Sequence, residues 1–277
     1  MDGDRATRVR LTAGGCALDV APAVGGRIAA LEIDGWDVLR RDGWTDREWG
    51  SFVMAPWVGR LRDGRVAWRE RAWWMPTTEP PHALHGTVVD VGWAVVAIDA
   101  TSVTLETGFG EAWPFDATIR RRIELFDDRV VDRLTVTAAE PMPVVVGWHP
   151  WFRRRVVRLD GGRESAPVEL SVRAARRLQL DPDGLPTGRL GVPRDVPTDD
   201  VLLDVTGDPV VEWPGGPRLQ VHAPTATAWV VYAAHPDGVC VEPVTGLPDG
   251  LNGGLLGDPP VAAPGAPVVA EMTIGWR

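Results

Sequence analysis

The chain has 277 residues, of which 29 are basic and 38 acidic, so its formal net charge is −9 and its pI is near 5.1. This acidic balance argues against nucleic acid as a partner and favours a small ligand that is neutral or locally clamped. Every basic residue is arginine. Catalysis through a lysine Schiff base and a P-loop lysine are therefore both excluded.

Two cysteines, Cys16 and Cys240, cannot form a disulfide framework, and the start of the chain lacks the apolar core of a signal peptide. No apolar run approaches the roughly 18 residues of a membrane helix. We therefore expect a cytoplasmic protein that does not enter a membrane. All-β chains of this length commonly form one domain, so residues 1–277 are expected to be a single domain.

Short runs rich in Val, Ile, Leu and Trp are separated by Gly, Pro and Asp, and this spacing indicates strands rather than helices. The predicted strands include Arg27–Ile33, Gly92–Ile98, Val130–Thr137, Pro143–Trp148, Arg218–His222, Thr227–Ala233 and Val268–Ile274. The fold class is therefore all-β, a sandwich or barrel. Two long connections, Asp181–Pro197 and Leu247–Pro267, are either borders of a ligand site or proline-stiffened surface loops.

Two segments place ionisable side chains where buried strands are expected to end. His149 follows a Val-rich run and precedes Pro150, and Glu242 lies in Val239–Pro243 before another proline. An imidazole and a carboxylate can move a proton onto one oxygen while removing it from another. The alternatives are an ordinary half-buried histidine and a buried salt bridge from Glu242 to an arginine.

Other polar residues are candidates for hydrogen bonds to a ligand. Arg60 follows an apolar turn, His85 precedes a glycine, and Asp199 and Asp200 precede a strand. We reject the hypothesis that His82-x-x-His85 binds a metal, because no third or fourth ligand lies at a recognisable spacing. The 14 tryptophans are mostly expected in the core, although some indoles could stack on a pyranose.

Taken in chain order, six segments resemble motifs of the aldose 1-epimerase family, which includes the galactose mutarotases. The segments are Val24–Ile28, Met54–Arg60, Leu84-His85-Gly86 with downstream Trp93, His149-Pro150-Trp151-Phe152, Thr198-Asp199-Asp200 and Val241-Glu242-Pro243. The resemblance implies a galactose mutarotase-like antiparallel β-supersandwich with a sugar cleft on one sheet. It implies no metal and no organic cofactor. It also implies a monosaccharide as the partner, bound by a monomer or homodimer.

The resemblance also implies roles. Glu242 is expected to be the general base for the anomeric hydroxyl, and His149 the general acid for the ring oxygen. The residues expected to hold the sugar are Arg60, His85, Asp199, Asp200 and Trp151. The implied activity is therefore an isomerase, an aldose 1-epimerase that interconverts the α and β anomers of a hexose such as glucose or galactose.

Three departures from the family pattern affect the expected substrate. Gly59 stands where the family often has asparagine, Trp151 replaces a tyrosine, and a strand would place Asp199 and Asp200 on opposite faces. The alternatives are a hexose-6-phosphate 1-epimerase, with Arg153–Arg155 as a phosphate site or merely a charged surface, and a non-catalytic sugar-binding module. A polysaccharide-active enzyme is disfavoured, because such enzymes often carry a further domain.

Overall fold

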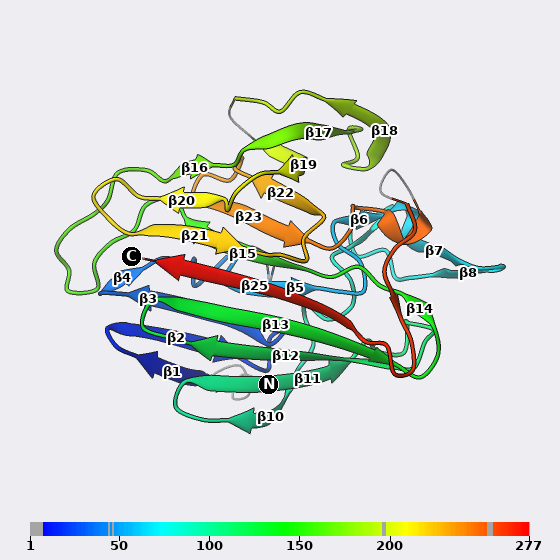
Figure 1. Ribbon diagram of the computed structural model, residues 1–277, viewed down its shortest axis with the longest axis horizontal. Coiled ribbons are helices and arrows are strands. Elements are labelled where there is room, and N and C mark those ends of the chain that lie inside the picture. The colour runs from blue at the N-terminus through cyan, green and yellow to red at the C-terminus, as the bar shows by residue number, and fades with distance from the viewer. Residues whose placement is uncertain (1–7, 44, 46, 196–197, 254–256, 277) are drawn as a thin grey trace.

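The computed structural model describes residues 8–43, 45, 47–195, 198–253 and 257–276. Within them, regular structure is almost entirely antiparallel β-strand, arranged in two large sheets and three strand pairs (Figure 1). Two short 3-10 turns, Arg62–Gly64 (η1) and Gly250–Asn252 (η2), are the helical elements of this part of the chain. It contains no helix long and apolar enough to cross a membrane. The predicted antiparallel all-β fold is confirmed.

The larger sheet brings distant segments together at its centre. In spatial order its strands are β1 (Val9–Ala13), β2 (Cys16–Ala21), β3 (Arg27–Ile33), β5 (Ser51–Met54), β15 (Gly147–Arg153), β23 (Gly238–Val244), β22 (Ala228–Tyr232), β19 (Asp199–Val205), β17 (Ala174–Leu180) and β18 (Pro186–Gly191), with β4 (Trp36–Asp37) paired to β3. β15 therefore lies between β5 and β23, far from both in sequence.

The second sheet covers one face of the first. Its strands in order are β10 (Ala94–Ile98), β11 (Ser102–Gly108), β12 (Ala117–Leu125), β13 (Arg129–Ala138), β25 (Val268–Trp276), β21 (Arg218–His222), β20 (Val210–Glu212) and β16 (Glu169–Ser171). The strand pairs are β14 (Met142–Pro143) with β24 (Val261–Ala262), β6 (Arg60–Leu61) with β9 (Ala83–Leu84), and β7 (Arg65–Trp68) with β8 (Arg71–Trp74).

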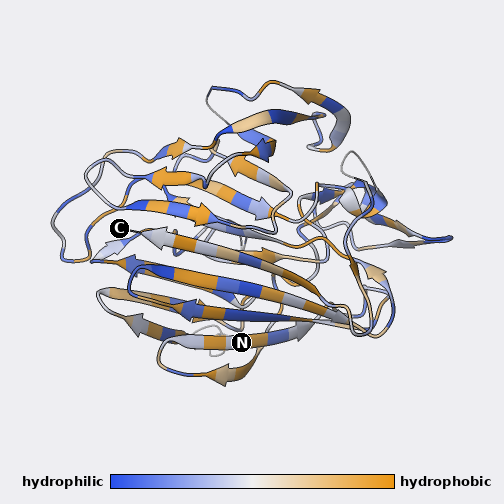
Figure 2. Ribbon diagram, in the orientation of Figure 1, coloured by the Kyte–Doolittle hydropathy of each residue, from blue (hydrophilic) through white to orange (hydrophobic). Residues whose placement is uncertain are grey.

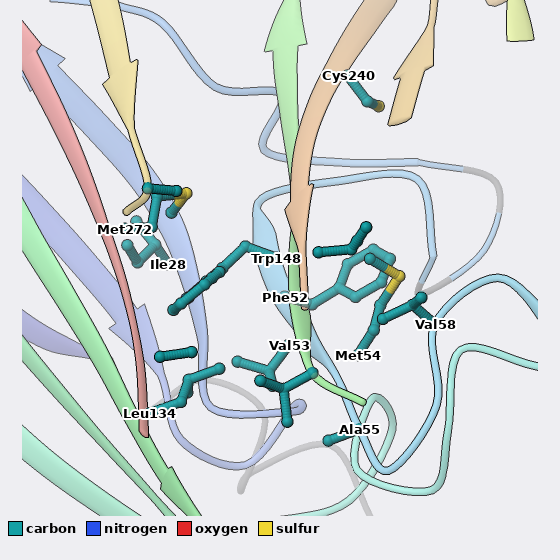
Figure 3. Close-up of a cluster of buried hydrophobic side chains, with 14 of the residues drawn as sticks. Ile28, Phe52, Val53, Met54, Ala55, Val58, Leu134, Trp148, Cys240 and Met272 are labelled. Atoms are coloured by element: carbon teal, nitrogen blue, oxygen red, sulfur yellow. The ribbon is translucent and has the colours of Figure 1, made fainter. Parts of the chain in front are cut away.

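The core lies between the two large sheets. Trp148 of β15 and Ile28 of β3 lie in one buried cluster with Leu134 of β13 and Met272 of β25, all four almost fully buried (Figure 3). The sequence explains why the core forms there, because apolar and polar residues alternate along the longer strands (Figure 2). Alternation directs every second side chain to the core. The opposite face of the larger sheet is not covered by the second sheet.

Most of the predicted strands agree with the structure to within two residues at each end, whereas one predicted strand is wrong and one predicted loop contains a strand. Arg27–Ile33 and Arg218–His222 are confirmed with the same bounds. The Pro143–Trp148 strand is wrong, because the chain leaves β14 at Pro143 and resumes pairing only at Gly147. The predicted loop Asp181–Pro197 contains β18, which forms a hairpin with β17; positions 196–197 lie outside the described residues.

Candidate active site

His149 and Glu242 stand opposite each other on the neighbouring antiparallel strands β15 and β23. The register pairs Gly147 with Val244 and Trp151 with Cys240, so His149 and Glu242 lie directly opposite each other between these two pairs. Opposite residues of an antiparallel pair project to the same face. His149 Nε2 is 3.3 Å from Glu242 Oε1, and both side chains are buried. Strand register thus creates the imidazole–carboxylate pair that two remote motifs predicted.

Both residues lie inside their strands rather than at strand ends. Pro150 follows His149 but pairs with Ser51 of β5, and Pro243 follows Glu242 but pairs with Trp229 of β22. A proline removes one N–H donor and keeps its carbonyl, so each strand continues. The side chains reach the ligand from the face of the sheet, and the predicted strand-end presentation is wrong.

Two parallel rows of side chains cross this face of the sheet. In the first, Phe52 pairs with His149, while Glu242 pairs with Val230 and Val230 with Val201. Residues two positions along each strand point the same way and form the second row. That second row is Trp151, Cys240, Tyr232 and Asp199.

A cavity of about 490 Å³ opens over these rows. This volume lies in the range of about 300–1,000 Å³ that is typical of small-molecule sites. The structure brings together around it six of the seven predicted site residues, namely His149, Glu242, Arg60, His85, Asp199 and Trp151. Arg60 lies in β6 of the β6–β9 strand pair and His85 directly follows β9, so both reach the cavity from outside the larger sheet.

The His149 ring is held between two aromatic neighbours. Phe52 stacks on it at a centroid distance of 4.6 Å and 24°, and Trp151 stacks at 5.4 Å and 20°. Trp151 is only 4% exposed and donates its indole N–H to the Arg47 carbonyl at 2.8 Å. The Trp151 ring thus fixes the plane of the imidazole, besides lining the cavity.

His85 reaches the site through a tight turn. Its backbone has φ 61°, and its N–H donates to the Gly59 carbonyl at 2.9 Å. Gly86 follows with φ 82°, and a Cβ there would lie 1.9 Å from the Ala55 carbonyl oxygen. Only glycine fits this approach. The turn sets the His85 ring 5.1 Å from the His149 ring in an edge-to-face contact.

Arg60 lines the cavity from β6, which pairs with β9. Its carbonyl accepts a hydrogen bond from the Asp249 N–H, and its guanidinium extends beside Gly184 of the β17–β18 hairpin. Gly59 before it has φ 57°, and a Cβ there would lie 2.9 Å from Pro248. Pro248 thus occupies the space into which a side chain at position 59 would point.

Burial dominates the electrostatics of the site. Desolvation raises the pKa of Glu242 well above its ordinary value, and the negative charge of Asp199 raises it further. Desolvation lowers the pKa of His149 to about 3, with a smaller contribution from the Arg27 charge. It also lowers the pKa of His85 well below the ordinary value, aided by the charge of His149. The pocket therefore favours the uncharged form of each group.

Asp199 and Asp200, at the start of β19, have different surroundings. Asp199 lines the cavity, and desolvation raises its pKa, an effect that the Arg60 charge opposes. Asp200 is 1% exposed, and its carboxylate lies 3.3 Å from Arg177 and 3.6 Å from Arg194. Asp200 therefore does not line the cavity, and its ion pairs anchor the neighbouring strand.

The arginine triplet that could have bound a phosphate is engaged elsewhere. Arg153 pairs with Asp37 at 2.8 Å, Arg154 donates to backbone carbonyls, and Arg155 donates to the Ser165 carbonyl. The described residues that line the cavity include none of the three. The His82-x-x-His85 pair is also divided, because His82 Nδ1 accepts the Asp63 N–H while His85 faces the cavity.

Three aromatic or basic residues of the cavity were missed in the sequence. Tyr232 and His235 meet the Trp151 ring edge-to-face at 5.8 Å and 5.3 Å, and Arg47, whose carbonyl accepts the Trp151 indole N–H, also lines the cavity. Tyr232 is the single tyrosine of the chain, at the end of a strand-like run, which was the one available signal. His235 and Arg47 lie in polar connections, so only the tertiary fold reveals them.

Comparison with known proteins supports this picture. Residues 7–245 match the family model for aldose 1-epimerase. A solved Escherichia coli K12 protein, provisionally assigned as an aldose 1-epimerase, superposes with a TM-score of 0.84 at 22% identity over 98% of this chain and 99% of its own. A galactose mutarotase-like protein of Clostridium acetobutylicum superposes with a TM-score of 0.83 at 17% identity, over 98% of this chain and 95% of its own. An aldose epimerase homologue of C. elegans superposes with a TM-score of 0.82 at 16% identity, over 98% of each chain.

No match was found among curated proteins. At these identities the solved structures show the fold, which is that of the galactose mutarotase-like proteins. The family model covers most of the chain, including His149 and Glu242. The chain belongs to the aldose 1-epimerase family.

Proposed function

We propose that the protein is an aldose 1-epimerase that interconverts the α and β anomers of a hexose such as glucose or galactose. The observation that carries the proposal is the buried His149–Glu242 pair, 3.3 Å apart on the floor of a cavity of sugar-binding size. A protein that only binds sugar has no need of a matched acid and base.

In the proposed reaction, the Glu242 carboxylate takes the proton of the anomeric hydroxyl while protonated His149 donates a proton to the ring oxygen. The bond between C1 and the ring oxygen breaks, and C1 becomes the aldehyde carbon. Rotation about the C1–C2 bond presents the other aldehyde face. Glu242 then returns its proton to the carbonyl oxygen as His149 recovers one from the ring hydroxyl, so no proton is gained or lost.

The remaining cavity residues would position the sugar. Arg60, His85 and Asp199 line the cavity around the pair and offer donors and an acceptor to hydroxyl groups. Trp151 would contribute mainly by holding the imidazole plane, since its indole N–H is already bonded to a backbone carbonyl. We propose no contact between Asp200 and the sugar, because its carboxylate is engaged by two arginines.

We favour an unphosphorylated hexose over a hexose 6-phosphate. The arginine triplet at 153–155 is engaged in an ion pair and in hydrogen bonds to backbone carbonyls. The cavity lining contains Arg47 and Arg60 together with the acidic residues Glu48, Glu79 and Asp199. Acidic residues at the rim would repel a dianion.

Polarimetry tests the proposal. Freshly dissolved α-D-glucose or α-D-galactose is followed with protein and with a buffer blank, and the two 6-phosphates are run in parallel. We expect faster relaxation to the same final rotation for at least one free hexose. Acceleration of the phosphates alone would reverse the substrate assignment. No acceleration, together with saturable sugar binding, would identify a non-catalytic binding module.

A further inference from the structure

Three side chains of types that bind metals in proteins meet at the floor of the cavity and directly beneath it. One ligand atom from each of His149, Cys240 and Glu242 lies within 4.8 Å of the others, and all three residues are buried. Cys240 and Glu242 alternate on β23 and so face the same way, while His149 projects from β15 opposite Glu242. Imidazole nitrogen, thiolate sulfur and carboxylate oxygen are the ligand types of zinc.

We propose that His149, Cys240 and Glu242 form an inhibitory site for a thiophilic divalent cation of the zinc class. Occupation of this site would block the acid–base pair. The binding part of the proposal stands on the geometry alone, whereas the inhibition rests on the proposed function.

The geometry needs only a small adjustment. Zinc bonds of about 2.0–2.3 Å in a tetrahedron place neighbouring ligand atoms about 3.3–3.8 Å apart. His149 Nε2 and Glu242 Oε1 already lie at 3.3 Å. The other separations, 4.8 Å at most, close with side-chain movements of about 1 Å. Phe52 and Trp151 stack on the His149 ring and hold its plane, so the adjustment falls to the Cys240 and Glu242 side chains.

Charge and access favour a divalent ion. Burial raises the pKa of Cys240 and of Glu242 well above their ordinary values, so both groups hold their protons until an ion displaces them. The thiolate and carboxylate then carry two negative charges beside a neutral imidazole, and a 2+ ion balances these charges, whereas an uncompensated buried charge is costly. His149 and Glu242 line the open cavity, so an ion can arrive through it. Cys240 lies below them and is fully buried. Three protein ligands and one position toward the cavity form an open rather than a closed zinc site.

An ion in this place would occupy the lone pairs that the reaction uses. Glu242 could no longer accept the hydroxyl proton, and His149 could no longer carry one to the ring oxygen. The ion and the sugar would also compete for the cavity floor. Inhibition should therefore be competitive with the sugar and reversed by a chelator.

Binding is tested on the full chain with Zn²⁺ in equilibrium dialysis and with Co²⁺ in absorption spectroscopy. We expect one Zn²⁺ per chain and a thiolate-to-cobalt charge-transfer band. Cys240→Ala should abolish the band and weaken Zn²⁺ binding by about tenfold or more. Cys16→Ala is the matched control, because Cys16 is also buried but lies in β2, and it should behave as wild type.

Circular dichroism checks that the variants fold, and Cys240→Ser replaces Cys240→Ala if the latter does not. Equal Zn²⁺ binding by wild type and the Cys240 variant, or no cobalt–thiolate band in wild type, overturns the site. Mutarotation is then measured with and without Zn²⁺. We expect inhibition that EDTA reverses, and a smaller fractional inhibition of Cys240→Ala, each protein being compared with its own metal-free rate.

Unchanged mutarotation at saturating Zn²⁺ overturns the blocking role. If the protein accelerates no mutarotation at all, the proposed function fails, whereas dialysis and the cobalt spectrum still decide whether the cation site exists.

Discussion

At the scale of single residues, burial makes His149 and Glu242 depend on each other. Each group is pushed toward its uncharged form, so the pKa of Glu242 is raised while that of His149 is lowered to about 3. At 3.3 Å the two can share a single proton. When the pair holds one proton and that proton is on His149, His149 is the acid and Glu242 is the base.

This coupling predicts the pH dependence of kcat/KM. Activity should fall at low pH as a second proton binds the pair, and at high pH as the single proton leaves. The alkaline limb should lie well above 4.5, the ordinary pKa of glutamate, because burial raises the pKa of Glu242. The profile is measured by polarimetry across roughly pH 3 to 10, with the buffer rate subtracted at each pH. A rate that rises through 4.5 and stays flat above would show instead that a solvated glutamate acts alone.

Removal of the carboxylate tests its role directly. Glu242→Gln keeps the size of the side chain and cannot accept the hydroxyl proton, so kcat should fall by about 10²–10⁴-fold. The sugar dissociation constant should change little, as measured by calorimetry. Glu79→Gln is the matched control, because Glu79 also lines the cavity but lies in an exposed loop. Similar losses of kcat in both variants would count against a specific base.

At the scale of strands, register decides which charges act on the pair. Asp199 lies in the second row of the sheet, and its negative charge helps to raise the pKa of Glu242. Asp199→Asn should therefore lower the pKa of Glu242 and move the alkaline limb of kcat/KM to lower pH. It should also raise KM if Asp199 holds the sugar. An unmoved limb would show that Asp199 does not act electrostatically on Glu242.

Local sequence pattern could predict much of this arrangement, because motifs and alternation are local properties. Leu219 and Val221 are buried between exposed neighbours in β21, the alternation that is typical of a strand with one buried face. Residues that lie in recognisable motifs, such as His85 and Arg60, were found and do line the cavity. Their roles toward a sugar stay a prediction.

Contacts that depend on the pairing of remote strands could not be predicted in the same way. The closeness of Cys240 to His149 follows from the β15–β23 register, which no local pattern specifies. Tyr232 enters the site through its pairing with both Cys240 and Asp199. β18 lies within Asp181–Pro197, which was predicted to be a loop because its Gly- and Pro-rich sequence resembles a connection.

At the scale of the whole molecule, one buried arginine joins the two large sheets. Arg121 of β12 forms an ion pair with Asp132 of β13 at 2.6 Å, and both side chains are fully buried. It also donates to the carbonyls of Gly26 and Ser51, which belong to the larger-sheet side. Ser51 pairs with Pro150, next to His149. The link therefore supports the strand that carries the site. It also supports the single-domain organisation, which stays a prediction.

Breaking this link should be costly. Arg121→Ala leaves Asp132 buried without its partner and should lower the free energy of unfolding by about 3–5 kcal/mol. Its neighbour Arg120 pairs with Glu106 on the exposed face, so Arg120→Ala should cost about 0–1 kcal/mol. Urea denaturation of both variants provides the measurement. Comparable losses in the two would show that Arg121 has no special role between the sheets.

The most direct test of the central claim is exchange spectroscopy by NMR on a hexose already at anomeric equilibrium. Ring opening then appears as magnetisation transfer between the α and β anomeric protons, with no net reaction to confuse it. We predict exchange cross-peaks in the presence of wild-type protein and their loss with Glu242→Gln at the same concentration. Wild-type protein that binds the sugar without transfer, or a Glu242→Gln variant that retains full transfer, would contradict the account.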